Sequence, residues 1–254
     1  MIDVAFTGAQ VRSTETAVVI DVLRATSTIA LALASGYERV LVAGGLEQAQ
    51  ALRGPGRVLA GELRCEQPEG FDLGNSPEET LSPRGPELVL ATTNGAPAIL
   101  AAAAAAKQVY AASLLNLEAM LATLAAFDGD VLLVCAGTDG GVTIEDTYLA
   151  GRLSAALGGE RSDAAQVAEA VAAAYPRPLD ALNASIGAHN LRAVGLDADI
   201  AFCARESIVS VVPRLSTTIG AVAVLAPVGA KPPADARLLT DAAKSGLPAG
   251  AANP

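Results

Sequence analysis

Short apolar runs alternate with alanine-rich stretches over the first 160 residues of the chain. The apolar runs have the length and β-branched content of buried strands and cover residues 18–20, 40–42, 58–60, 88–90, 108–110 and 131–135. The stretches between them predict helices over residues 26–34, 46–52, 96–106, 115–126 and 143–157. Continuous apolar strands separated by helices are typical of a mostly parallel sheet covered on both faces. We therefore predict an α/β fold, a layered α/β/α arrangement with a mostly parallel or mixed sheet.

The C-terminal half is richer in helices. The pattern predicts helices over residues 164–174, 179–184 and 188–194, followed by late strands over 208–212 and 218–225. We interpret residues 1–226 as a single α/β domain, with a change near residue 160 that could mark a sub-domain. Residues 227–254 are rich in proline, alanine and glycine, and we expect a loose tail there.

Composition and charge narrow the class of protein. Of 254 residues, 52% are hydrophobic and 17% are charged, which excludes a disordered chain. Aromatic residues make up 3%, so a binding surface of stacked aromatic rings is not expected. The formal net charge of −10 repels nucleic acids and anionic membranes at long range. A phosphorylated ligand would therefore need arginines, a metal ion or helix N-termini close to it.

Cysteine and histidine usage favours a reduced, cytoplasmic protein. The three cysteines are widely separated and form no CxxC pair. The single histidine, His189, excludes a multi-histidine zinc site and is expected on a helix surface, while nearby Asp197 and Asp199 are expected to be solvated or capping. We predict no signal peptide and no membrane-spanning segment. The alanine-rich helices and small charged fraction favour apolar contact between subunits, hence a homodimer.

Polar residues that follow the predicted strands carry the candidate chemistry, because ligands of open parallel sheets bind beyond the carboxyl ends of the strands. Asp21 ends an apolar strand, and Arg24 follows in the turn. A carboxylate there can hold Mg²⁺, and a nearby arginine can clamp a phosphate or carboxylate. Thr26 and Ser27 would present donors at the start of the next helix. The alternative is an ordinary Asp–Arg pair with an N-cap.

The irregular segment 61–75 supplies a second set of candidates. Glu62 stands at a strand end, Arg64 follows it, and Asn75 lies beside a helix start. The alternative for Glu62 is a solvated loop charge. The next four residues, Ser-Pro-Glu-Glu at 76–79, match a capping box with proline at the first helical position and are assigned no chemistry.

A third set is formed by Thr92, Thr93, Asn94 and Gly95, which follow a strand and open a helix. Two hydroxyls, an amide and free N–H groups at the positive end of a helix form a cradle for an anion. Plain N-capping by Asn94 is the alternative interpretation.

The fourth set follows the strand at 131–135. A glycine-rich turn leads to Thr143, Glu145 and Asp146. Either acidic residue could supply a second metal ligand, or Thr143 and Asp146 could form a box-like helix cap. The sequence alone does not choose between these roles.

Together these segments resemble one family, the ComB-type 2-phosphosulfolactate phosphatases. The resemblance extends over most of residues 18–151 and is carried by Asp21-Val22-Leu23-Arg24-Ala25-Thr26, Gly61-Glu62, Gly70-Phe71-Asp72-Leu73-Gly74-Asn75-Ser76-Pro77, Thr92-Thr93-Asn94-Gly95 and Cys135-Ala136-Gly137 with Glu145-Asp146. It implies an α/β enzyme that uses Mg²⁺ to release inorganic phosphate from 2-phosphosulfolactate, giving sulfolactate, in the biosynthesis of coenzyme M.

We hypothesise that Asp21, with Glu62 or Asp146, holds Mg²⁺ while Arg24 and the Asn94–Gly95 helix end bind the phosphoryl oxygens. The other substrate-binding candidates are Thr26, Ser27, Arg64, Asn75, Thr92 and Thr93. Either a metal-bound water attacks phosphorus or Asp21 forms an aspartyl phosphate.

The resemblance has one departure. After the Gly-Glu pair the family usually continues with arginine and then a glycine and a lysine, whereas residues 63–69 here read Leu-Arg-Cys-Glu-Gln-Pro-Glu. The substrate could therefore be another small phosphorylated hydroxy acid. A non-catalytic module that binds phosphorylated or sulfonated metabolites is the alternative from a different class.

Overall fold

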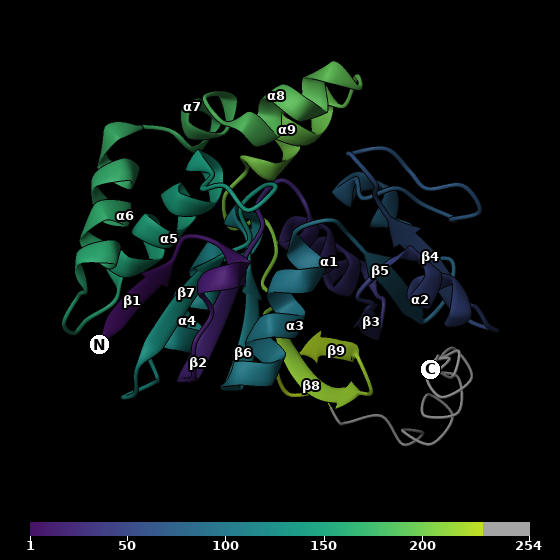
Figure 1. The fold of residues 1–254 in the computed structure, drawn as a ribbon, viewed down its shortest axis with the longest axis horizontal. Helices are drawn as coiled ribbons and strands as arrows, with labels where there is room; N and C mark the ends of the chain where they lie inside the picture. The colour runs from purple at the N-terminus through teal and green to yellow at the C-terminus, as the bar shows by residue number, and fades with distance from the viewer. Residues whose placement is uncertain (231–254) are drawn as a thin grey trace, which may run out of the picture.

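The computed structural model describes residues 1–230, which form one mixed sheet with helices on both faces (Figure 1). In this range the sheet has nine strands in the order β1-β7-β2-β6-β8-β9-β3-β5-β4. The strands are β1 (Ile2–Ala5), β2 (Thr14–Ile20), β3 (Arg39–Val42), β4 (Arg57–Gly61), β5 (Glu87–Ala91), β6 (Ala106–Ala112), β7 (Val131–Cys135), β8 (Pro213–Ile219) and β9 (Val222–Pro227). The predicted layered α/β class is confirmed.

Helices cover both faces of the sheet. They are α1 (Ala25–Ser35), α2 (Leu46–Ala51), α3 (Gly95–Ala105), α4 (Leu117–Leu124), α5 (Ile144–Ala156), α6 (Asp163–Ala174), α7 (Pro178–Asn183), α8 (Ile186–Ala193) and α9 (Asp197–Cys203), with 3₁₀ turns η1 (Gly8–Gln10), η2 (Pro77–Thr80) and η3 (Leu114–Asn116). α1 and α3 pack with Ala17 and Val19 of β2, whereas α4 and α5 pack with Val18 and Ile20. β2 is therefore buried on both faces, as its unbroken apolar run predicts.

A C-terminal hairpin, β8–β9, lies between two parallel blocks of the sheet. β1, β7, β2 and β6 pair in parallel, as do β3, β5 and β4. The hairpin strands pair antiparallel with each other and with β6 and β3. β8 meets β6 at one paired position, Tyr110 with Arg214, and the hairpin crosses the direction of β2 and β6 steeply (Figure 1). The sheet turns at this seam, so that the carboxyl ends of both blocks reach one cleft.

The late strands differ from the prediction. Residues 208–212 are not a strand: the segment runs along η3, and the backbone N–H groups of Ser207 and Val209 donate to carbonyls of that turn. The single strand predicted over 218–225 is divided between β8 and β9 by a turn at Gly220, whose φ of 58° suits glycine. Apolar residues continue through this turn, so the sequence pattern does not show that the chain changes direction here. The sequence pattern also does not predict β1 or α9.

The description covers only the start of the expected tail. Residues up to 227 complete β9, and residues 231–254 lie outside the described residues. Across the described range, no helix has both the length and the apolar character that crossing a bilayer demands.

Gly151 lies where α5 crosses α6, and it tests how closely these helices pack. A Cβ at this position would lie 2.0 Å from the Ala168 carbonyl oxygen and 2.8 Å from Ala172 Cβ. We expect Gly151→Ala to lower the free energy of unfolding by about 1–3 kcal/mol, because the backbone of α6 must shift. Intrinsic helix propensity alone would give the opposite sign, by about 1 kcal/mol.

Urea unfolding followed by circular dichroism measures this change. Gly45→Ala is the matched control, because Gly45 has an extended φ of 179° and no heavy atom within 4 Å of the added Cβ. A Gly151→Ala protein that is as stable as the wild type would contradict the close crossing.

Candidate active site

A polar cavity lies where the loops that follow β2, β4, β5 and β7 meet, beneath α8. Its lining residues are Asp21, Leu23, Arg24, Glu62, Cys65, Asn75, Asn94, Thr138, Gly187 and Asn190. We call this cavity the cleft. A second polar cavity of ≈ 520 Å³ shares Arg24, Cys65 and Asn75 with it and extends toward α8 and α9. The predicted location beyond the strand ends is thus where the polar side chains converge.

Asp21 is buried directly after β2, and its two carboxylate oxygens have different neighbours. Oδ1 accepts a hydrogen bond from the Ala25 N–H at 3.2 Å. Oδ2 lies against the backbone of Gly95, where an added Cβ would be 2.3 Å away. Only glycine permits this approach, so the role of Gly95 is to let the start of α3 contact the carboxylate.

Thr26 and Ser27 face inward rather than into the cleft. Both are fully buried, and their hydroxyls donate to the carbonyls of Asp21 and Val22, each at 2.8 Å. They close the turn that presents Asp21, so their predicted contact with substrate has no support in this geometry.

Three further carboxylates lie near Asp21. Glu62 Oε1 accepts from the Thr93 N–H at 2.5 Å, and its Oε2 accepts from the Cys65 N–H at 2.9 Å. Asp146 accepts from the N–H groups of Val22 at 2.9 Å and Gly137 at 3.1 Å. Asp146 therefore ties the loop after β2 to the loop after β7, and the box-like cap predicted at the start of α5 is wrong.

Glu145 is the fourth carboxylate and is the least satisfied. Its side chain is buried, and within residues 1–230 its Oε2 has no hydrogen-bond partner. An added Cβ at Gly187 would lie 2.2 Å from Glu145 Oε1, so α8 packs directly over this carboxyl group. The sequence offers Glu145 only as an alternative to Asp146.

Burial and mutual repulsion raise the pKa values of Asp21, Glu145 and Asp146. Desolvation by burial, followed by the negative charge of Asp146, raises the pKa of Asp21 to about 8. Desolvation and the charge of Glu145 likewise raise the pKa of Asp146 to about 8. Desolvation is also the main cause that raises the pKa of Glu145 to about 7. A divalent cation would compete with these protons.

The donors that face the cleft fit Mg²⁺ without forming a complete cage. In residues 1–230, no three side chains of His, Cys, Asp or Glu converge as ready metal ligands. Mg²⁺ commonly keeps several waters and binds through one or two carboxylates, so a full protein cage is not required. Asp21 and Glu62 would supply oxygen ligands, and the buried Asn75 Oδ1 has no hydrogen-bond partner among the described residues. Asp146 does not line the cleft, and its two oxygens bind the backbone of two loops, so its position favours a structural role.

Among the described residues, Arg24 is the positively charged side chain that lines the cleft. Its side chain is buried, Nη1 donates to Asp199 Oδ2 at 2.6 Å, and Nη2 donates to the Cys65 carbonyl at 2.9 Å. The expectation that Asp199 is solvated or capping is wrong, because Asp199 is buried and paired with Arg24. The two residues are 175 positions apart, so no local pattern links them.

In the segment after β5, the roles of Thr92 and Asn94 differ from those that the sequence predicts. Thr92 Oγ1 accepts from the Ala96 N–H at 2.9 Å, so Thr92, and not Asn94, supplies the side-chain cap of α3. Asn94 lines the cleft, and its Oδ1 accepts from the Asp139 N–H at 3.1 Å, which connects this loop to the one after β7. Thr93 is exposed and contributes its backbone N–H to Glu62.

The remaining polar residues differ in whether they line the cleft. Arg64 is exposed and does not line either polar cavity, whereas Asn75 lines both. His189 is exposed, as expected, while its neighbour Asn190 lines the cleft. Asn190 could have been found only by knowing that α8 covers the sheet edge, which the local sequence does not indicate.

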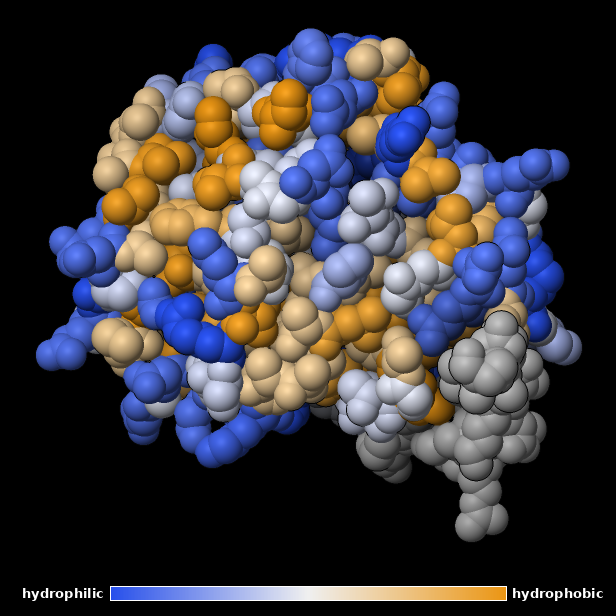
Figure 2. All heavy atoms as spheres, in the orientation of Figure 1, coloured by the Kyte–Doolittle hydropathy of each residue, from blue (hydrophilic) through white to orange (hydrophobic). Residues whose placement is uncertain are grey.

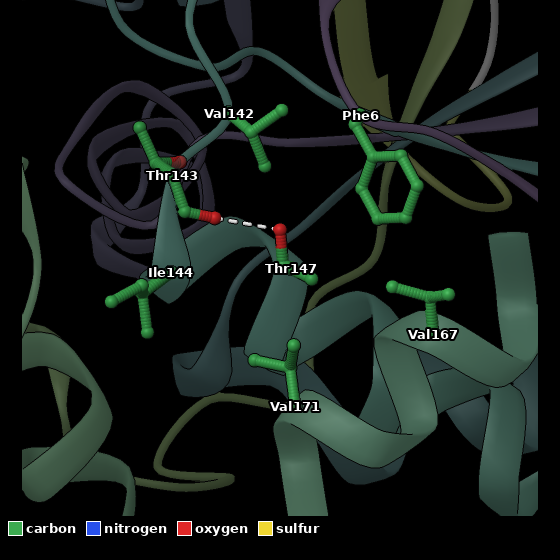
Figure 3. Close-up of a pocket in the computed structure, with 7 residues that line it drawn as sticks. All are labelled: Phe6, Val142, Thr143, Ile144, Thr147, Val167 and Val171. Carbon is green, nitrogen blue, oxygen red and sulfur yellow. Dashed lines mark hydrogen bonds between the residues drawn. The ribbon is translucent and has the colours of Figure 1, made fainter.

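A third cavity, shown in Figure 3, is apolar and does not compete with the cleft as a site of phosphate chemistry. It measures ≈ 280 Å³ and is lined by Phe6, Val142, Thr143, Ile144, Thr147, Val167 and Val171. The hydroxyl of Thr147 donates to the carbonyl of Thr143 at 2.6 Å, so this polar group is already satisfied. Phosphoryl groups need cations or directed N–H groups, and these lie in the cleft.

Comparison with known proteins agrees with this geometry. Residues 5–218 match the family model described as 2-phosphosulpholactate phosphatase. A protein of Thermus thermophilus named "Probable 2-phosphosulfolactate phosphatase" is 44% identical over 210 residues, covering 80% of this chain and 88% of the relative. A protein of Thermotoga maritima with the same name is 38% identical over 222 residues, covering 85% and 95%.

The raised pKa values predict how stability depends on pH when no metal is bound. The native carboxyl groups keep protons that the unfolded chain releases near its ordinary values of 3.8 for Asp and 4.5 for Glu. Because the folded state binds more protons, the free energy of unfolding should fall as the pH rises from about 4 to about 8. Urea unfolding in EDTA across this range measures the slope.

Asp21→Asn should make the slope shallower, because one of the protonated groups is removed. Asp128→Asn, at an exposed position on the loop before β7, is the matched control and should leave the slope unchanged. A wild-type stability that rises with pH over this interval would contradict a protonated carboxyl cluster.

Proposed function

The chain belongs to the 2-phosphosulfolactate phosphatase family, and from this premise we propose that it hydrolyses the phosphomonoester of 2-phosphosulfolactate to sulfolactate and inorganic phosphate with the help of Mg²⁺. The observation that carries the proposal is that Asp21, Glu62 and Arg24 line one cleft. A phosphatase must neutralise the charge of its substrate and hold it in line for attack, and this set of groups serves both needs.

Positive potential in the cleft has two sources in the chain itself. Arg24 lies in the wall with N–H groups beyond the two used by Asp199 and Cys65. The N-terminus of α3, an 11-residue helix, begins at Gly95 against Asp21. Its partial positive charge favours an anion at this end. These groups offset the net charge of −10 locally.

Asp21 and Glu62 would hold Mg²⁺, with the unpartnered Asn75 Oδ1 as a further oxygen donor. When bound, the ion would neutralise phosphoryl charge and lower the pKa of a water ligand. The backbone N–H groups of Ala25, Thr93 and Cys65 fix the orientation of the two carboxylates. Glu145 and Asp146 are buried near Asp21 and do not line the cleft.

Two nucleophiles agree with this arrangement: a water molecule, or Asp21 Oδ2, the oxygen that does not accept from the Ala25 N–H. Water attack breaks the P–O bond directly, whereas attack by Asp21 forms an acyl phosphate that water then cleaves. Chemical trapping during turnover separates the two, since hydroxylamine or borohydride would modify Asp21 only if an acyl phosphate forms there.

Phosphate release from racemic 2-phosphosulfolactate, measured with Mg²⁺ and with EDTA, tests the proposal. We expect metal-dependent release that is faster than with phospholactate or phosphoglycerate. Preference for another ester would retain the chemistry and direct attention to residues 63–69, where the family pattern changes.

Asp21→Asn should reduce turnover by about 10²-fold or more, because it removes a charged group that acts in the transition state. Asp128→Asn is again the control and should retain wild-type turnover. If Asp21→Asn kept full turnover, Asp21 would not be catalytic. If the wild type bound phosphoesters but released no phosphate, the protein would be a binding module.

A further inference from the structure

We propose that Asp199 on α9 is a positioning residue, which together with Ser76 holds the Arg24 guanidinium in the wall of the cleft. The proposal rests on the proposed function, because it assigns the groups that orient the phosphate-binding arginine. It links the helical C-terminal half of the chain to the chemistry at the strand ends.

The contacts join three segments that lie far apart in the sequence. Asp199 Oδ2 accepts from Arg24 Nη1, and Asp199 Oδ1 accepts from Ser76 Oγ, each at 2.6 Å. The side chains of Arg24 and Asp199 are only 2% and 4% exposed. Each oxygen of the carboxylate therefore has its own donor, which fixes the carboxylate. The guanidinium is held at two nitrogens, by Asp199 at Nη1 and by the Cys65 carbonyl at Nη2.

Ser76 has a role that its sequence context does not suggest. It precedes η2 and has Pro77 at the first helical position, as a capping box predicts. Its side chain makes no cap, however, and donates instead to Asp199. The glutamate of the predicted box, Glu79, accepts from the Gly74 N–H at 2.7 Å. The serine at the N-cap position of η2 thus anchors Asp199 and does not cap the turn.

The charges around Arg24 explain why a positioning partner is needed. Asp21 and Glu62 line the same cleft as Arg24 and are negatively charged when they hold a cation. Without Asp199, the guanidinium would be drawn toward these two carboxylates. It would then compete with the cation that they are proposed to bind. Asp199 holds Nη1 of Arg24 in place, and the Cys65 carbonyl holds Nη2.

Asp199→Asn is the first test, because it keeps the size of the side chain and removes the charge. An amide offers one acceptor and one donor group, so it cannot accept from both Arg24 and Ser76. We expect kcat to fall by about 10- to 100-fold and the Mg²⁺ concentration for half-maximal rate to rise. Asp197→Asn is the matched control on the same helix: the Asp197 side chain is 67% exposed and 3.8 Å from Arg192.

A double-mutant cycle distinguishes positioning from general stabilisation. In an Arg24→Gln background, Asp199→Asn should cost almost no further kcat, because the residue through which it acts is already absent. Ser76→Ala provides a second variant that removes one hydrogen bond with little change in volume, and it should show a smaller loss of the same kind. Urea unfolding of each variant verifies that it is folded under assay conditions.

Calorimetric binding of inorganic phosphate gives a readout that does not depend on turnover. Affinity should fall alike in Arg24→Gln, Asp199→Asn and the double variant. Additive losses, or an Asp199→Asn protein that behaves like Asp197→Asn, would overturn the proposal. A wild type that binds phosphate but hydrolyses no ester would overturn the proposed function, while the binding cycle would still decide the role of Asp199.

Discussion

The cost of burying several carboxylates side by side is the constraint around which this molecule is arranged. Buried Asp21, Glu145 and Asp146 lie together, with half-buried Glu62 beside them, in a chain that is already strongly acidic. Unpaired charges in such a place are costly, and they are relieved by protonation, by a cation or by hydrogen bonds. Much of the local architecture supplies such hydrogen bonds from backbone N–H groups. The same groups that relieve the cost also fix the geometry of the cleft.

The sequence predicts the elements that depend on local pattern. The strand that ends at Asp21 and the helix that follows it appear where the apolar runs place them. The parallel strands bring Asp21, Glu62 and Asn94 to one cleft, as expected for polar residues that follow strands. The family resemblance drawn from these motifs is confirmed by the match over residues 5–218.

What the sequence does not predict depends on contacts between distant segments. Asp199 meets Arg24 only because α9 folds back over the strand ends, and nothing near Asp199 indicates a buried ion pair. Asparagine is a strong capping residue, so the sequence offers Asn94 as a possible cap of the helix that follows. In the structure Thr92 caps α3, and Asn94 binds the loop after β7. In both places tertiary contacts override a local preference.

The placement of the hairpin has a consequence for the order in which the protein can assemble. During synthesis β6 and β3 emerge long before β8 and β9, the strands that lie between them. Until residue 227 has been made, the sheet exists as two parallel halves, each with an uncovered edge that can pair with another chain. The cleft draws residues from both halves, so it takes its final shape only after the last strand is inserted. Strands near the end of the described range are thus needed to complete a site whose side chains all precede them in the sequence.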